Sequence, residues 1–246
     1  MKIDFHIHTN LSPCSPMTLD EAVGASLRAG ISGFAVCNHN TPFYLESIPS
    51  HIEKKYNVKI NPKTKCNNAF YIIPGIEIET EIGHQLKLFI DKESHASNEI
   101  TVLAHPFEHS REYTSRAKLL SEKATDVNML VEAYSGRANY KNKKACEMAK
   151  KFAHEHNFLL CAGSDAHFPF EIGNAWVEFN DDVYTLEDIK EALVGGKNTY
   201  YSKNCKRTII AKSQIIKNGY KPKTVLFYFY SLIRDFGDLL CRRSHL

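Results

Sequence analysis

The chain has 246 residues, of which 43% are hydrophobic and 24% are charged, and this composition is ordinary for a globular protein and excludes global disorder. Its length suits one α/β domain of barrel size or two smaller domains. The formal net charge of +3 hides an asymmetry, because residues 1–196 carry 20 Lys and Arg against 26 Asp and Glu, whereas residues 197–246 carry 11 against 2. We interpret the basic tail either as an arm for nucleic acid or another anionic surface, or as a solvated extension packed on the acidic body.

The N-terminal residues and the cysteines favour a cytoplasmic protein. The first residues lack the apolar core of a secretion signal, and the longest apolar run, Val225 to Tyr230, is too short to cross a bilayer. Seven cysteines without a C-x-x-C pair indicate neither a disulfide framework nor a structural zinc knuckle. We therefore expect a cytoplasmic enzyme with no membrane span.

Short apolar runs typical of strands alternate with helical segments along the chain. Thr18 and Glu21 have capping-box spacing at the start of a first helix near residues 18–29, and Gly30 ends it. Further helices are predicted over residues 185–195 and 222–241. Strands are predicted over residues 2–8, 33–38, 70–78, 84–90, 100–104, 128–133, 158–163 and 174–179. Strand followed by helix, repeated, indicates an α/β fold with right-handed parallel crossovers.

Two histidines stand two residues apart in the first predicted strand. Side chains alternate between the faces of a strand, so His6 and His8 point the same way and Asp4 lies on their face. This is a geometry for binding a metal ion. An H-x-H triplet taken alone is also compatible with ordinary surface or core histidines.

Further metal-ligand side chains follow the later predicted strands. Each stands where a strand is expected to end, and in a parallel barrel such ends share one rim, so residues spread over 160 positions would converge on one pocket. The additional candidates are His39, Glu77, His105, Asp165 and His167.

Imidazole and carboxylate ligands without paired thiolates are typical of catalytic metal sites and suit Zn²⁺, Mn²⁺ or Fe²⁺. The candidates exceed what one tetrahedral ion uses, so two or three divalent metal ions are expected. A carboxylate such as that of Glu77 is able to bridge a pair of ions. Closely spaced metals activate water and neutralise charge on a phosphoryl group, which indicates hydrolysis of an anionic ester.

Five motifs occur in an order that resembles the polymerase and histidinol phosphatase (PHP) family. They read DFHIHTNLSPCS, VCNHNT, PGIEI, LAHPF and AGSDAH. The resemblance covers about residues 1–200 and implies a distorted (β/α)7 barrel, an α/β fold, with phosphoesterase activity. A PHP-like domain over residues 1–200 and a basic C-terminal extension with a terminal helix over residues 201–246 are therefore expected.

The resemblance also implies roles for individual residues. A first metal would be held by His6, His8, Glu77 and Asp165. Glu77 would bridge to a second metal held by His105, and His39 with His167 would hold a third. His84 lies near the position of another second-metal histidine in the family, or it is an ordinary strand residue. Asp165 and Glu77 are the expected catalytic carboxylates.

The chain departs from the family pattern at several positions. Where relatives usually carry the aspartate that serves the third metal, this chain has Pro13, followed by Cys14. Either the Cys14 thiolate takes over, or the third position is weak or empty. Asn38 replaces a usual aspartate, which changes a hydrogen-bond partner rather than a ligand. Arg137 is either a phosphate clamp or a surface residue at the start of a helix.

Two functions are weighed. The first is a metal-dependent phosphoesterase acting on a phosphomonoester or small phosphodiester, with a small phosphorylated substrate. The second is a catalytically weakened PHP-like binding or regulatory module that contacts nucleic acid through its basic tail. Retention of the other ligands favours the first, because buried charged groups are costly to keep without a metal. The oligomeric state and the particular ester are not encoded in any motif; specificity is expected in loops 41–68 and 106–127.

Overall fold

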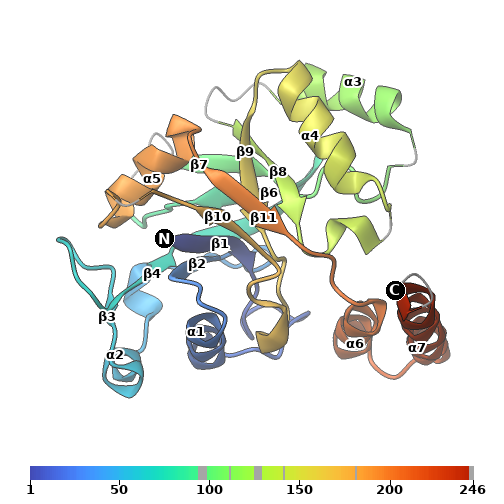
Figure 1. Ribbon diagram of the computed structural model, residues 1–246, viewed down its shortest axis with the longest axis horizontal. Helices are drawn as coiled ribbons and strands as arrows, with labels where there is room; N and C mark the ends of the chain where they lie inside the picture. Colours follow the sequence, from blue (N-terminus) through green and yellow to red (C-terminus); the bar gives the residue numbers. More distant parts are fainter. Residues whose placement is uncertain (94–98, 111, 125–128, 141, 181, 244–246) are drawn as a thin grey trace.

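The computed structural model describes residues 1–93, 99–110, 112–124, 129–140, 142–180 and 182–243, with side chains up to residue 236. Within this part of the chain the strands form two mixed sheets with helices packed outside them (Figure 1). Residue 128, where one predicted strand begins, lies outside the described residues, as do residues 111 and 125–127 of the second expected specificity loop.

The first sheet has the strand order β11-β10-β1-β2-β4-β3. Strand β1 lies at its centre, parallel to β2 and antiparallel to β10, with Ile3 opposite Gly33 on one side and Val177 on the other. The strands are β1 (Lys2–Ile7), β2 (Gly33–Val36), β3 (Lys59–Ile60), β4 (Ala69–Ile73), β10 (Ala175–Glu178) and β11 (Thr199–Ser202).

The second sheet has the order β5-β6-β7-β8-β9. Its strands are β5 (Gly75–Thr80), β6 (Gly83–Leu88), β7 (Ile100–Leu103), β8 (Met129–Ser135) and β9 (Leu159–Gly163). The strand predicted over residues 70–78 is divided at Pro74, which has no amide hydrogen for a sheet ladder. A tight turn at Gly83, whose φ is +104°, folds β5 back on β6. The β5-β6-β7 part is therefore antiparallel, and the prediction of parallel crossovers throughout is wrong there.

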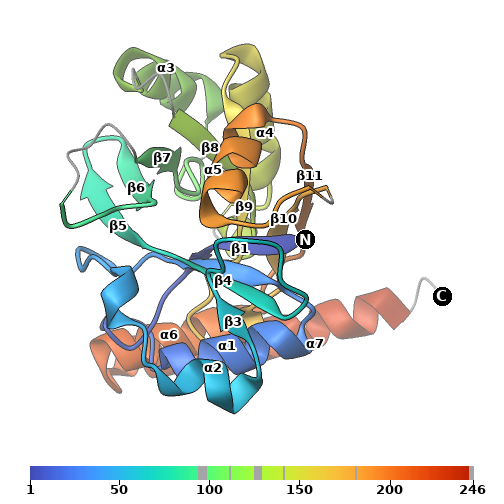
Figure 2. The same cartoon turned by 90° about the vertical axis from the view of Figure 1, so that its left-hand side faces the viewer.

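Helices cover the outer faces of both sheets, and apolar side chains of the two sheets share one core. That core joins Ile3 and Phe5 of β1 to Leu86, Val102 and Leu130 of the second sheet. Figure 2 shows α1 and α2 beneath the first sheet, and α3 and α4 at the far end, against the second. The helices before the tail are α1 (Leu19–Arg28), α2 (His51–Tyr56), α3 (Tyr113–Lys123), α4 (Ala145–Glu155) and α5 (Leu186–Gly195), with short 3-10 turns η1 (Leu45–Ser47), η3 (Ala138–Tyr140) and η4 (Pro169–Glu171).

The predicted α/β class is confirmed, whereas the described strands do not pair into a closed seven-stranded barrel. The two sheets meet through isolated bridges instead: Ile7 with Ala166, His39 with Glu77, and Phe43 with Gly75. The backbone hydrogen bonds at this seam are few, because each ladder ends where the chain turns into a loop. The candidate ligands stand at the same seam.

The tail forms a helical hairpin of α6 (Arg207–Asn218) and α7 (Pro222–Arg243), and Figure 2 shows α7 extending past the body. Asp235 of α7 accepts hydrogen bonds from the backbone N–H and the hydroxyl of Thr208 at 3.0 and 2.8 Å, which caps α6. Strand β11, which sequence reasoning missed, crosses the predicted boundary at residue 200. No helix within the described part of the chain combines the length and the apolar character needed to cross a membrane.

Candidate metal centre

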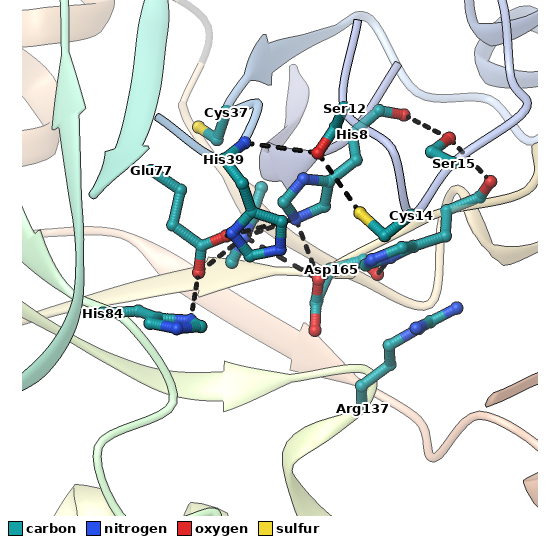
Figure 3. Close-up of polar contacts among 12 residues, drawn as sticks. His8, Ser12, Cys14, Ser15, Cys37, His39, Glu77, His84, Arg137 and Asp165 are labelled. Atoms are coloured by element: carbon teal, nitrogen blue, oxygen red, sulfur yellow. Dashed lines mark hydrogen bonds and ion pairs between the residues drawn. The ribbon is translucent and has the colours of Figure 1, made fainter. Parts of the chain in front are cut away.

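Strands of both sheets and the loops that follow them bring the eight predicted ligand side chains to one place. Figure 3 labels His8, His39, Glu77, His84 and Asp165 among them. His6 lies in β1 and His8 directly follows it; His39 follows β2, and Asp165 and His167 follow β9. Glu77 and His84 lie inside β5 and β6 rather than at strand ends, because the chain divides at Pro74. The candidate ligands therefore converge on one place, as the sequence predicted. Two of them, Glu77 and His84, come from the antiparallel hairpin of β5 and β6 rather than from the ends of parallel strands.

The buried carboxylate of Glu77 lies at the middle of the cluster. Its Oε1 is 2.8 Å from His84 Nδ1, 3.3 Å from His105 Nε2 and 3.7 Å from His6 Nε2. Its Oε2 is 2.9 Å from His39 Nδ1 and 3.4 Å from His8 Nε2. The two oxygens therefore face two different groups of imidazoles, which is the arrangement that a bridging carboxylate requires.

A second carboxylate, that of Asp165, also lies close to His6 and His8. Its Oδ1 lies 3.1 Å from His8 Nε2 and 3.8 Å from His6 Nε2. Asp165 and His105 both have positive φ, at 54° and 29°. Such conformations cost about 1–3 kcal/mol each for residues other than glycine and are typically retained at functional sites.

Hydrogen bonds fix which ring nitrogens face inward. His6 Nδ1 lies 2.9 Å from Oε1 of buried Glu132, and His167 Nδ1 lies 2.8 Å from the backbone oxygen of Asp165. Because these partners accept hydrogen bonds, each Nδ1 donates to them, which leaves Nε2 of each ring for other partners. His6 Nε2 lies 3.2 Å from His8 Nε2. Burial would lower the pKa of His6, but the charges of Glu132, Glu77 and Asp165 raise it well above its usual range.

Several buried polar atoms of the cluster lack a hydrogen bond of acceptable geometry among the described residues. They are both oxygens of Glu77, Nδ1 of His8 and Nδ1 of His84, although imidazole nitrogens lie close to the Glu77 oxygens. Unsatisfied buried polar atoms are costly, and a cation among them satisfies carboxylate oxygens and nitrogen lone pairs together. The donor set therefore fits divalent metal ions.

Four overlapping groups of side chains have ligand atoms within 4.8 Å of one another. Two of these groups share the carboxylate of Glu77. One also contains His6 and His8, and the other contains His39 and His84. The remaining groups are His6 with His105 and Glu132, and His8 with Cys14, His39 and His167.

Charges within the cluster shift its pKa values. Burial alone would raise the pKa of Glu77, but the charge of His6 and contacts with His105 and His39 hold it well below its usual range. Burial would lower the pKa of His39, but contacts with Cys14 and Glu77 raise it to about 10. Burial lowers the pKa of His8 to about 4, so His8 is neutral and able to ligate at neutral pH.

Arg137 does not lie free to clamp a phosphate. Its Nε and one terminal nitrogen contact the two oxygens of Glu171 at 2.8 and 2.7 Å, and that nitrogen also contacts Ser213 Oγ at 2.8 Å. The side chain is buried, so the alternative of a surface arginine is wrong. The fork that would match a phosphate is occupied by Glu171 instead.

Two acidic residues are positioning groups that sequence reasoning did not assign. Glu132 accepts from His6 through Oε1 and from the backbone N–H of His105 through Oε2, at 2.9 Å each. Asp4 accepts from the backbone N–H of Ser164 at 2.8 Å, and burial raises its pKa to about 7. The signal for Glu132 was a single carboxylate within an otherwise apolar strand.

The departure at Asn38 agrees with the prediction that it changes a hydrogen-bond partner. Its Oδ1 accepts from the backbone N–H of Thr9 at 2.8 Å, and its Nδ2 lies 3.0 Å from the Thr9 hydroxyl. The pair ties the loop after β1 to the loop after β2.

The two mixed sheets and the buried seam of imidazoles and carboxylates define an α/β protein with a candidate multi-metal centre. A family described as PHP-associated matches residues 143–198. This match agrees with the resemblance of the five ordered motifs to the PHP family. The ligand clusters are compatible with binding of metal ions.

An uncharacterized protein of Methanocaldococcus jannaschii is 29% identical over 245 residues, covering 91% of this chain and 88% of the relative. An amidohydrolase structure from Chromobacterium violaceum, with bound sulfate and no metal, has a TM-score of 0.56 and 13% identity over 78% of this chain and 96% of that chain. PsfC from Pseudomonas syringae has a TM-score of 0.52 and 12% identity over 94% and 98%. At these identities the two structures show similarity of fold.

Proposed function

We propose that the chain is a metal-dependent phosphoesterase that hydrolyses a phosphomonoester or a small phosphodiester. The observation that carries the proposal is the buried Glu77 carboxylate, whose two oxygens face separate sets of imidazoles. The Glu77 side chain is 1% exposed and lies among five histidines. Bound metal ions would account for burying a carboxylate in such surroundings.

The resemblance to the PHP family implies the proposed ligand sets, and the short distances from Glu77 and Asp165 to the histidines support them. His6, His8, Glu77 and Asp165 would hold one ion, and Glu77, His84 and His105 would hold a second. His39 and His167 would contribute to a third. When bound, such ions supply Lewis acidity, which activates water near neutral pH and offsets negative charge on a phosphoryl group.

The protein side chains would orient the substrate and exclude water. His6 and His8 are fully buried, whereas His39 and His84 are 25% and 32% exposed, so the substrate would approach from the side of these two rings. Asp165, 13% exposed, would be the carboxylate that passes a proton to the leaving oxygen.

Metal-loaded protein tests the proposal directly. The protein is purified with Mn²⁺ or Zn²⁺ and assayed with p-nitrophenyl phosphate and bis-p-nitrophenyl phosphate. His8→Ala should abolish turnover, while His154→Ala, an exposed histidine of α4, should leave it unchanged. Equal turnover by His8→Ala and the unsubstituted protein would refute the site.

Metal content separates this enzyme from the binding-module alternative. Fewer than one bound ion per chain would favour the module. Binding of nucleic acid by the basic tail remains a prediction, and it should weaken steeply with salt if tail lysines contact phosphates.

A further inference from the structure

We propose that Cys14 completes the third metal position as a thiolate ligand beside His39 and His167, and that this position therefore selects zinc over manganese. The inference rests on the proposed function, because it concerns one position of the same centre. It differs from the family pattern, in which the sequence position next to Cys14 supplies a carboxylate.

Cys14 lies where a ligand is needed. Its sulfur is within 4.8 Å of ligand atoms of His8, His39 and His167, and its side chain is 3% exposed. The ring of His8 is fully buried, and its Nδ1 has no hydrogen-bond partner among the described residues. Four side chains that are able to ligate a metal, three of them buried, therefore lie together at this position, and a cation there would satisfy them jointly.

The loop that carries Cys14 is held in place at both ends. Ser15 Oγ lies 3.1 Å from the backbone oxygen of His8 and 2.8 Å from that of His167, so one hydroxyl links the loop to the ends of β1 and β9. The backbone N–H of Asn10 donates to Met17 O at 2.7 Å across the base of the loop. Cys14 is therefore positioned by the fold rather than free to swing away.

A hydroxyl lies beside the sulfur of Cys14. Ser12 Oγ lies 3.2 Å from Cys14 Sγ and accepts a hydrogen bond from the backbone N–H of His39 at 3.3 Å. A hydroxyl is able to donate to a thiolate, which has no proton of its own, so this contact is compatible with the sulfur as a metal ligand. The thiol proton leaves to solvent when the metal binds.

His39 and His167 each have a ring nitrogen available to bind an ion beside Cys14. His167 Nδ1 is engaged by the backbone oxygen of Asp165, and His39 Nδ1 faces Glu77, so Nε2 of each ring is left for an ion beside Cys14. Thiolate with two imidazoles is a soft donor set that favours zinc, whereas manganese prefers carboxylate and water oxygens. The thiolate thus distinguishes this position from the other two, which carry carboxylates.

Cobalt substitution reads out the sulfur ligand without measuring hydrolysis. The cobalt-loaded protein should show a thiolate-to-cobalt charge-transfer band in the near ultraviolet. Cys14→Ser and Cys14→Asp should lose the band. Cys37→Ala should keep it, because the Cys37 sulfur contacts the backbone oxygen of Phe5 in the core instead.

Metal competition supplies the second measurement. After dialysis against excess manganese, the unsubstituted protein should retain about one zinc ion per chain that Cys14→Ser loses, and Cys14→Asp should exchange that ion for manganese. Circular dichroism of each variant verifies that it is folded. Bound cobalt without the charge-transfer band, or a band that persists in Cys14→Ser, would overturn this inference alone, whereas absence of any bound cobalt would overturn the proposed function as well.

Discussion

The buried pair of Arg137 and Glu171 joins the tail to the loop that carries His167. Glu171 is fully buried and accepts from two nitrogens of Arg137 and from the backbone N–H groups of His167 and Phe168 at 2.9 and 3.1 Å. Arg137 also contacts Ser213 of α6. Removing the guanidinium would leave a buried carboxylate without its counter-charge.

We therefore expect Arg137→Met to lower the free energy of unfolding by about 3–5 kcal/mol, the usual cost of breaking a buried ion pair. For a chain of this size that corresponds to a fall of about 6–20 °C in the thermal midpoint. Unfolding is followed by circular dichroism. The double variant Arg137→Met with Glu171→Gln should recover part of the loss, because no unpaired charge remains.

Lys151→Ala is the matched control, because it removes an exposed pair in which Lys151 lies 3.7 Å from Glu155. It should change the free energy of unfolding by less than about 0.5 kcal/mol. A thermal midpoint of Arg137→Met within about 2 °C of the unsubstituted protein, or a double variant less stable than the single one, would refute the reasoning.

Three other substitutions probe the site and its scaffold. Glu132→Gln weakens the acceptor that orients His6, so metal affinity measured by calorimetry should fall about 10–100-fold; unchanged affinity would contradict the positioning role. Gly163→Ala would place a methyl 2.3 Å from His6 Cβ and should destabilise by about 1–3 kcal/mol or more in chemical denaturation, whereas Gly195→Ala meets nothing within 4 Å and should be tolerated. The Tyr184 backbone N–H holds the pKa of Asp188 below 3.8, so its stabilising charge is fully present above that pH and is lost as the pH falls through the folded value. Asp188→Asn should therefore lower the thermal midpoint at about pH 7, and the difference should shrink as the pH falls below 3.8.

Local signals in the sequence predicted many of the elements. Thr18 accepts from the backbone N–H of Glu21 at 3.2 Å while Glu21 accepts from Thr18 at 2.8 Å, so the predicted capping box is confirmed. The helix expected at residues 185–195 is present as Leu186–Gly195, capped by Thr185. Such features depend on residues three or four apart, which is why the sequence alone indicates them.

Long-range partners account for the predictions that failed. Glu132 contacts His6, which lies 126 residues away in the sequence. A single carboxylate in a strand such as β8 is compatible with a solvent-facing side chain as well as with a buried one, so the sequence did not indicate this contact. The fork of Arg137 meets Glu171 34 residues later, and no local pattern marks that pairing. The division of the strands into two sheets depends in the same way on contacts that sequence spacing does not specify.

The position of the candidate site follows from how the two sheets meet. No ladder joins the described strands of the two sheets, and the isolated bridges Ile7–Ala166 and His39–Glu77 include or adjoin candidate ligands. Because the ladders stop at this seam, side chains must hold the sheets together there. His6 and His8 come from the first sheet and Glu77 from the second, so ions shared by these residues would cross-link the sheets. That cross-link would also offset the cost of the strained backbone at His105 and Asp165, about 1–3 kcal/mol each.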